Sequence, residues 1–386
     1  MKIALLGAFP VYQYRDQVAF WTSRQSSSPT WNYNLAMALA RIPGVEVHVL
    51  TNAPRLTTRT VMDRGVHVHL VGHPPKVDLW EHLTALQLTR HRYRHLLRKL
   101  SPDIVHGSGT DHEYGYAAVM SGFPSVVTVH GVMRSVVARL GLPFYSFAAM
   151  LARFEQIVID RSRFLIAIGE YVVRQFPEFH GEVFHIPNAV SEHFFREPSS
   201  GGPDILFVGR IEPRKRVLNL IQAVANIRSD FPDIHVALVG LSAGPYAEQV
   251  RDSIQSAGLQ SRIRLLGLRN QEEISTLLAT ARMLVLPSIE ETTPMVVAEA
   301  QVLGKPVIAT RVGGVPEMVE DEVTGLLVEP DDVPALTASI RRLMANRDEC
   351  GAMGTKAKEW SRARYHPDVV ARQTVDAYEA VVAGRI

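Results

Sequence analysis

The chain has little cysteine and no long apolar run, and both absences narrow what it can be. Cys350 is the only cysteine among the 386 residues, which excludes an intrachain disulfide and any metal site built from several cysteines. Its neighbours offer no arrangement that marks a nucleophile, and it is compatible with a reducing compartment. No apolar run approaches the ~18 residues of a membrane-spanning helix. We therefore expect a cytoplasmic protein.

The chain also lacks an excess of charge of either sign. Lys and Arg together number 41 against 39 for Asp and Glu, so we expect no nucleic-acid partner, and any anion must be held by local groups.

The run KIALLGAF at residues 2–9 has no basic flank or cleavage site, which favours a buried first strand over a signal peptide. A length of 386 residues favours two domains of about 150–200 residues each.

Several motifs of cofactor chemistry are missing. The sequence has no phosphate-binding loop of the G-x-x-x-x-G-K-[ST] type and no clean Asp-x-Asp pair. GSGTDH at residues 107–112 begins like a dinucleotide fingerprint, but His112 stands where the third glycine belongs. We therefore discount nicotinamide binding and expect neither a metal ion nor a cofactor.

What is present is an alternation of Val/Ile/Leu-rich runs with longer helical patterns. Uninterrupted apolar runs are typical of strands covered on both faces, and strand–helix alternation indicates parallel α/β sheets. We expect strands at residues 2–9, 45–51, 66–72, 103–109, 125–131, 163–169, 204–210, 235–240, 262–267, 283–288, 306–310 and 325–329.

Two such series lie on either side of a Pro, Ser and Gly-rich stretch. We predict two Rossmann-like, doubly wound parallel-sheet domains facing across a cleft, with residues 1–187 and 203–365 separated by a linker at about 188–202. The helical pattern at about 366–386 is not needed by the second sheet. Ligands of such sheets bind beyond the carboxyl ends of the strands.

The first motif at such a strand end is GRIEPRKR, residues 209–216. Gly209 allows close approach to the backbone, while Arg210 and Lys215 are cations suited to the oxygens of a diphosphate. A helix is expected to begin near Val217. A solvated basic turn remains an equal alternative for this motif alone.

The second motif is PSIEETTPMVVAEA, residues 287–300. We predict Thr293 as N-cap, Pro294 as the first helical residue and a helix to about Leu303. The free amides of the first turn suit a phosphate. The groups we expect to contact a ligand are the Glu291 and Glu299 carboxylates, Thr293, and the Met295 and Val296 amides. The alternative for the carboxylates is two ordinary surface glutamates.

Two further features are less specific. His130 follows a strand of the first domain and can bond a sugar hydroxyl, although its position alone favours a structural histidine. His106 at a similar position is assigned to packing or to lining the cleft. The segment 89–100, TRHRYRHLLRKL, is a basic amphipathic pattern. It is more often a solvated face than a peripheral contact with an anionic membrane.

Taken together, these motifs resemble those of the family 4 glycosyltransferases, retaining enzymes of the GT-B fold. The resemblance rests on GRIEPRK, PSIEETTPMVVAEA, GKPVIAT, GGVPEMV and TGLLV, which follow one another between residues 209 and 328. It implies transfer of a hexose-type sugar from a nucleotide-diphosphate sugar, with UDP favoured, to a hydroxyl acceptor without a metal ion. It also implies that the final helix packs back onto the first domain.

The resemblance assigns roles to individual residues. Arg210 and Lys215 would bind the donor diphosphate, Glu299 the ribose hydroxyls, Glu291 the donor sugar near its reacting carbon, and His130 a donor hydroxyl. The base would be recognised by backbone near Gly240 and Leu268, and the acceptor by the region of Trp31–Tyr33.

This sequence departs from the family in three places. Thr292, Thr293 and Pro294 replace a Gly-Phe-Gly, Arg216 replaces a glycine, and Ser26 and Ser27 stand where the first domain has a Gly-Gly phosphate loop. Two other functions stay open: a nucleotide-sugar 2-epimerase of similar fold, and a nucleotide-sugar binding protein without activity.

Overall fold

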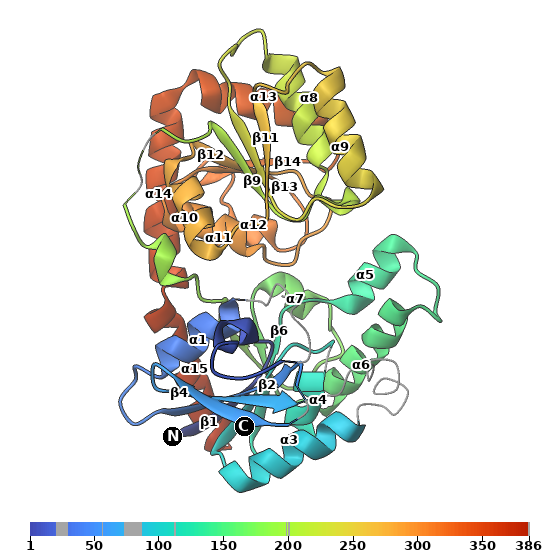
Figure 1. Cartoon of the computed structure of the whole chain (residues 1–386), viewed down its shortest axis with the longest axis vertical. Helices are drawn as coiled ribbons and strands as arrows, with labels where there is room; N and C mark the ends of the chain where they lie inside the picture. The colour runs from blue at the N-terminus through green and yellow to red at the C-terminus, as the bar shows by residue number, and fades with distance from the viewer. Residues whose placement is uncertain are drawn as a thin grey trace. The chain divides into compact units, whose positions relative to one another are not determined.

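A computed structural model describes residues 1–20, 30–55, 57–72, 87–111, 113–197, 199 and 201–384. The chain divides into two compact units, one of Met1–Ala189 with Pro367–Ile386 and one of Val190–His366. Figure 1 shows each unit as a twisted sheet flanked by helices. The expected α/β class is confirmed for both.

Within the described residues, the first unit holds an eight-stranded sheet of order β3-β4-β2-β1-β5-β6-β7-β8, in which only the β3–β4 pair is antiparallel. Its elements are β1 (Lys2–Leu6), η1 (Val11–Tyr14), α1 (Trp31–Leu39), β2 (Glu46–Ala53), β3 (Arg59–Asp63), β4 (Val66–Gly72), α3 (Gln87–Leu100), β5 (Ile104–Ser108), α4 (Glu113–Val119), β6 (Ser125–Val129), α5 (Met133–Leu140), α6 (Phe147–Arg161), β7 (Phe164–Ala167), α7 (Glu170–Arg174), β8 (Glu182–His185) and α15 (Pro367–Val382).

Alternation of side chains along β1 shows why this sheet is covered on both faces. Ile3 and Leu5 are buried in one hydrophobic cluster, and Ala4 and Leu6 are buried in another. Successive strand residues point to opposite faces, so a continuous apolar run fills two cores at once. Helix α15, distant in sequence, packs beside α1 in the first of these clusters, as Figure 1 shows.

The second unit has a parallel sheet of order β11-β10-β9-β12-β13-β14 among its described residues. Helices α8, α9 and α13 lie together, as do α10 and α11 (Figure 1). The elements are η2 (Glu192–Phe194), β9 (Ile205–Val208), η3 (Pro213–Lys215), α8 (Val217–Ile227), β10 (Val236–Val239), α9 (Pro245–Ser256), β11 (Ile263–Gly267), α10 (Gln271–Thr280), β12 (Met283–Leu286), α11 (Met295–Val302), β13 (Val307–Thr310), α12 (Val315–Met318), β14 (Gly325–Val328), α13 (Val333–Ala345) and α14 (Arg347–Tyr365).

Every strand predicted from the sequence is present. Most are shorter than predicted, but β4 has the predicted bounds and β2 extends to Ala53; β3 and β8 were not predicted. Strand β3 exposes most of its residues and reaches β4 through Arg64 and Gly65, both of which have positive φ. Strand β8 is a half-buried edge strand of four residues. Neither has the continuous apolar run on which the prediction depended.

The stretch predicted as a linker spans the division between the units. Its residues from Val190 onward are part of the second unit, and Val190 and Phe194 are fully buried in that unit's core. The apolar content of the stretch therefore serves packing, although its Pro, Ser and Gly content predicted an open connection.

Helix α3 contains the basic segment 89–100. It buries Tyr93 and Leu97 completely and exposes Arg94, Arg98 and Lys99. The core of the first unit therefore occupies much of the apolar face that a bilayer would have to cover. Among the described helices, none combines the length and the apolarity required to cross a membrane.

Candidate active site

The switch point of the second sheet lies between β9 and β12. The strand order runs outward in opposite directions from this pair, so the loops that follow β9 and β12 diverge and leave a crevice for a ligand. Lys215 ends η3 after β9, and Glu291 lies in the loop between β12 and α11. The two motifs singled out in the sequence therefore meet at one edge of the sheet.

The Lys215 ammonium and the Glu291 carboxylate form an ion pair there. Both side chains are nearly buried, with 10% and 7% of their surface exposed. The Ser288 hydroxyl donates to the same Glu291 oxygen at 2.7 Å. A buried charge that loses its partner is strongly unfavourable, so each of these charges holds the other in place until an anion or a hydroxyl competes for it.

Glycines bring the neighbouring loops into contact. Gly313, after β13, has a φ of +54°, and a Cβ there would lie 1.6 Å from the Glu291 carbonyl oxygen. Gly240, after β10, has a φ of +148°, and its Cβ would lie 1.8 Å from the carbonyl oxygen of Gly209. No side chain fits at either position, and the loops after β9, β10, β12 and β13 consequently touch through their backbones.

Donor groups for an anion remain free around this pair. The Arg210 guanidinium is exposed and has no ion-pair or hydrogen-bond partner among the described residues. Helix α11 begins at Met295, and within the described part of the chain the amides of Met295 and Val296 donate to no group. The start of a helix carries partial positive charge, which makes it suitable for a phosphate.

Glu299 lies in α11 with 9% of its surface exposed and no hydrogen-bond or ion-pair partner among the described residues. Burial raises the pKa of its carboxyl group to about 7. A buried carboxyl without a partner is costly, and such groups gather at functional sites. The hydroxyls of a ligand would remove that cost by donating to the carboxylate.

The predicted cap of α11 is wrong by one residue. Pro294 is the N-cap, with a φ of −68° and a ψ of 113°, and Thr293 caps nothing. The Gly314 amide donates to the Thr292 carbonyl oxygen at 2.9 Å, which ties the segment before Pro294 to the loop after β13. The Thr293 hydroxyl oxygen is left buried without a partner in the described structure.

Leu268 and Arg216, both singled out in the sequence, lie on the surface of the second unit. The Leu268 side chain is 63% exposed, next to Gly267, whose carbonyl oxygen accepts from the Gly240 amide at 2.9 Å. Arg216 has a φ of +48° and pairs with Asp331 at 2.7 Å. The positive φ explains why a glycine is favoured at that position.

The first unit has its own switch point, between β1 and β5. The Asn32 side-chain amide donates to the Ala8 carbonyl oxygen at 2.9 Å, so its Oδ1 faces Ser108. The Ser108 hydroxyl donates to that oxygen at 2.6 Å and lies 2.7 Å from Nε2 of His130. Because the Ser108 proton is committed to Asn32, His130 must donate from Nε2.

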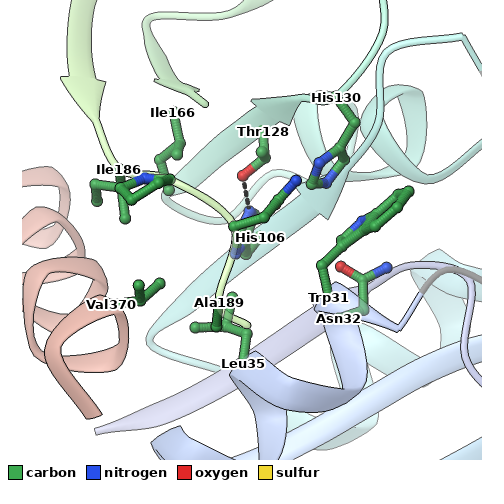
Figure 2. A pocket seen from close by; sticks show the side chains of 12 residues that line it. Trp31, Asn32, Leu35, His106, Thr128, His130, Ile166, Ile186, Ala189 and Val370 are labelled. Atoms are coloured by element: carbon green, nitrogen blue, oxygen red, sulfur yellow. Dashed lines mark hydrogen bonds between the residues drawn. The ribbon is translucent and has the colours of Figure 1, made fainter. Parts of the chain in front are cut away.

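His130 is therefore a neutral histidine with a free acceptor. Burial lowers its pKa to about 3, and its Nδ1, which carries no proton in this tautomer, is buried without a partner in the described structure. The ring lies beside Trp31, with centroids 4.9 Å apart, and both line a small pocket (Figure 2). The geometry allows Nδ1 to accept a hydrogen bond from a hydroxyl.

His106, which the sequence assigned to packing or to lining the cleft, has a structural role. Its Nδ1 lies 2.6 Å from the Tyr378 hydroxyl of α15, and its Nε2 lies 2.6 Å from the Thr128 hydroxyl, the latter bond visible in Figure 2. Burial lowers its pKa to about 3. Both ring nitrogens are thus occupied, and the residue joins β5, β6 and α15.

The two units match two glycosyltransferase family models. Residues 29–194 match "Glycosyltransferase Family 4", and residues 190–360 match "Glycosyl transferases group 1". The chain carries both domains of a GT-B glycosyltransferase.

Individual relatives agree with this assignment. A D-inositol 3-phosphate glycosyltransferase of Nocardiopsis dassonvillei is 28% identical over 89% of this chain and 87% of its own. One from Corynebacterium efficiens is 38% identical over 41% of this chain and 38% of its own. The first curated relatives are matched over only 21% to 42% of their length.

Solved structures show the same GT-B fold. A sucrose-phosphate synthase from Thermosynechococcus elongatus superposes with a TM-score of 0.80 at 20% identity, covering 100% of both chains. Anabaena HepE in complex with UDP and glucose gives a TM-score of 0.72 at 17% identity, over 98% of this chain and 100% of its own.

One supporting residue of this GT-B protein escaped the sequence reasoning. Glu155 of α6 is completely buried, and its carboxyl group accepts from the amides of Met133 at 2.9 Å and Arg134 at 3.2 Å. It thereby caps α5 and fixes the loop that follows His130. Burial raises its pKa to about 7, and no sequence motif marks it.

Three further residues that contact the site were not individually predicted, and one predicted loop lies outside the described residues. Ser288 belongs to the P-S-x-x-E pattern, three residues before Glu291, and received no role. Asn32 and Ser108 have no motif of their own. The expected phosphate loop at Ser26 and Ser27 lies outside the described residues.

Proposed function

We propose that the chain transfers a sugar from a UDP-sugar to a hydroxyl acceptor, with retention of anomeric configuration and without a metal ion. The observation that carries this proposal is the set of free groups around the Lys215–Glu291 pair. These are the unpartnered Arg210 guanidinium, the open amides at the start of α11 and the unpartnered Glu299 carboxyl. A pyrophosphate joined to a ribose requires groups of these kinds.

The diphosphate would be held by two side-chain cations and by backbone amides. Arg210 and Lys215 supply two cations, and the amides of Met295 and Val296 supply hydrogen bonds aligned with the helix dipole. As the bond between the sugar and the diphosphate breaks, negative charge grows on the leaving oxygen. Groups already arranged around that charge stabilise the transition state, usually the largest catalytic term.

The carboxylates and His130 would orient the sugar and the ribose. Glu299 would accept from the ribose hydroxyls, and Glu291, once a phosphate competes for Lys215, would accept from the donor sugar near its reacting carbon. The free Nδ1 of His130 would accept from a further donor hydroxyl. Each assignment pairs a group that lacks a proton with a hydroxyl that has one to donate.

The reaction needs no enzyme nucleophile. The C1–oxygen bond to the diphosphate breaks, the acceptor oxygen bonds to C1 on the same face, and the acceptor proton passes to a phosphate oxygen of the departing UDP. The donor choice is supported by HepE, which is described in complex with UDP and glucose. Backbone near Gly240 and Leu268 would recognise the base, and Trp31–Tyr33 would contact the acceptor. We expect this reaction in the cytoplasm.

The experiment that tests the proposal uses Arg210→Ala. Arg210 is exposed and has no partner among the described residues, so folding should be unchanged while transfer falls by roughly 10²-fold. The assay is release of UDP from a panel of UDP-sugars with and without acceptors. Arg228→Ala, which removes an exposed arginine at the far end of α8, is the matched control and should keep its activity.

Near-normal transfer by Arg210→Ala would overturn the role of this cation. Conversion of the donor without any acceptor would favour the 2-epimerase, and tight UDP binding without turnover would favour a binding protein. Lys215→Ala should also abolish transfer, but it leaves Glu291 buried without its cation. Its stability must therefore be measured before a loss of rate is assigned to catalysis.

A further inference from the structure

At the amino-terminal ends of the first sheet, three potential metal ligands lie on one face. Glu46 and His48 are two residues apart on β2 and so point to the same side of the sheet. His67 of β4 is the direct register partner of His48. One ligand atom from each of the three side chains lies within 4.8 Å of the others. We propose that Glu46, His48 and His67 bind one Zn²⁺ ion.

The donor set fits zinc. Zinc is bound in proteins by histidine nitrogen and carboxylate oxygen, and two His with one Glu is a known ligand set that leaves a fourth position for water. Nε2 of His48 and Oε1 of Glu46 are already 2.9 Å apart. His48 is buried, His67 is partly buried and Glu46 is exposed, so the cluster has a fixed base and an open side through which an ion can enter.

A second layer of hydrogen bonds orients the buried ligand. Nδ1 of His48 lies 3.0 Å from Nε2 of His69, and Nδ1 of His69 lies 2.9 Å from the Thr60 hydroxyl. If His69 donates to the Thr60 oxygen, its Nε2 accepts from Nδ1 of His48. Nε2 of His48 then carries a lone pair directed at the Glu46 side. Partners of this kind fix the tautomer of metal-ligating histidines.

Among the described residues, the cation that competes for Glu46 is Lys2, and its pairing is weak. Lys2 lies 3.7 Å from the second carboxylate oxygen of Glu46, and the two side chains are 35% and 48% exposed. Such surface pairs contribute little. A divalent ion that also gains two imidazole nitrogens would displace Lys2 without leaving a buried charge unpaired.

The site is separate from the proposed active site. From His48 to the carboxyl end of β2 at Ala53 is five residues, or roughly 17 Å, and the residues proposed for transfer follow the carboxyl ends of strands. The ion would join β2 to β4 and brace that side of the sheet. It would have no part in glycosyl transfer, so either proposal can fail while the other stands.

The test is zinc titration of the full chain, freed of any affinity tag and stripped with a chelator. Calorimetry should show one zinc ion per chain, and zinc should raise the melting temperature. His67→Ala and Glu46→Gln should each weaken binding by at least ~10-fold, and Thr60→Val, at an exposed position, should weaken it by about 10-fold through His69.

The matched control is His185→Ala. His185 lies 3.1 Å from Glu170 in the same unit, and this His–Glu pair has no third ligand among the described residues. Loss of His185 should leave zinc affinity unchanged. The proposal is overturned if the wild-type chain binds no zinc, if His67→Ala binds as tightly as the wild type, or if His185→Ala loses as much affinity. Should His67→Ala fail to fold, His67→Gln gives the same comparison.

Discussion

At the residue scale, three groups lack a side-chain partner within the described residues. The Glu299 carboxyl and Nδ1 of His130 are buried, whereas the Arg210 guanidinium is exposed. The sequence identified all three from strand ends and motif spacing. Their lack of partners is a property of the fold, and it is what supports a ligand.

Glu299 should make stability depend on pH. Its folded-state pKa of about 7 is above the ~4.3 of an unfolded glutamate, so its full contribution is present below about pH 4 and is lost as the pH rises through 7. Relative to Glu299→Gln, the wild-type free energy of unfolding should fall by up to about 3 kcal/mol between pH 4 and pH 8. Urea unfolding of both proteins across this range is the measurement, and a constant difference would contradict the burial argument.

The affinity for UDP should depend on pH in the opposite direction to the stability. Hydroxyls that donate to the Glu299 carboxylate favour its charged form, so UDP binding should strengthen as the pH rises from 6 to 8 more in the wild type than in Glu299→Gln. Comparing the two proteins removes the titration of the nucleotide itself. Equal pH profiles would place the ribose elsewhere.

Ser108→Ala should weaken transfer by changing the His130 tautomer. Without an acceptor at Ser108, Nε2 of His130 has no reason to hold the proton, and we expect kcat/KM to fall roughly 5- to 10-fold, the loss of about one hydrogen bond. Nitrogen NMR of the imidazole should show the protonated nitrogen changing. Ser135→Ala removes a serine hydroxyl that bonds Gln175 at 2.6 Å instead and should change neither.

At the element scale, the second unit is shaped by loops that follow strands and meet through glycine. Helix α11 starts one residue later than its sequence indicates because Thr292 is bonded to Gly314 in the next loop. Local capping preferences predicted Thr293, and a contact between loops overrode them. The helix itself was correctly predicted, as were the positions of Glu291 in the loop before it and of Glu299 within it.

Gly313→Ala should displace Glu291. The new Cβ would lie 1.6 Å from the Glu291 carbonyl oxygen at a φ of +54°, so the loop must move, and we expect a loss of more than about 2 kcal/mol together with transfer activity. Gly258→Ala is the control, since its φ is +66° but nothing lies within 4 Å. It should cost only about 1–2 kcal/mol and keep activity. Urea unfolding of both variants is the measurement. Equal losses of stability would show that backbone strain at positive φ, and not the contact with Glu291, destabilises Gly313→Ala.

At the scale of the whole molecule, the chain returns to its first unit after completing the second. Helix α15 follows α14 in sequence but belongs to the unit of residues 1–189. It buries Val370, Ala371, Ala377, Tyr378 and Val381 there. The first unit is therefore complete only when the last helix has been made.

Tyr378→Phe should destabilise the first unit. It removes the hydroxyl that lies 2.6 Å from Nδ1 of the buried His106, and a buried polar group left without its partner costs about 1–3 kcal/mol. Tyr365→Phe is the control. Tyr365 is also buried, but its hydroxyl has no hydrogen-bond partner among the described residues, so its removal should hardly change the free energy of unfolding. Chemical unfolding of both variants is the test, and equal effects would deny the bond a role.

The sequence by itself determined the α/β class, the strands with continuous apolar runs and the final helix. It also singled out Lys215 and Glu291 in loops that follow strands, and Glu299 in the helix after the second of these loops. These features are local, because a buried parallel strand must be apolar on both faces and a ligand must lie beyond its carboxyl end. The edge strands β3 and β8 escaped because half-exposed strands carry no such run.

Only the tertiary structure decided which of these groups are paired. It joined Lys215 to Glu291 across 76 residues of sequence. It also placed Asn32 next to Ser108, and Ser108 next to His130, so that Asn32 decides which nitrogen of His130 carries the proton from 98 positions earlier in the chain. It also brought Glu46, His48 and His67 together across two strands. Hydrogen bonds and charges act over a few ångströms in space, and sequence spacing does not report that distance.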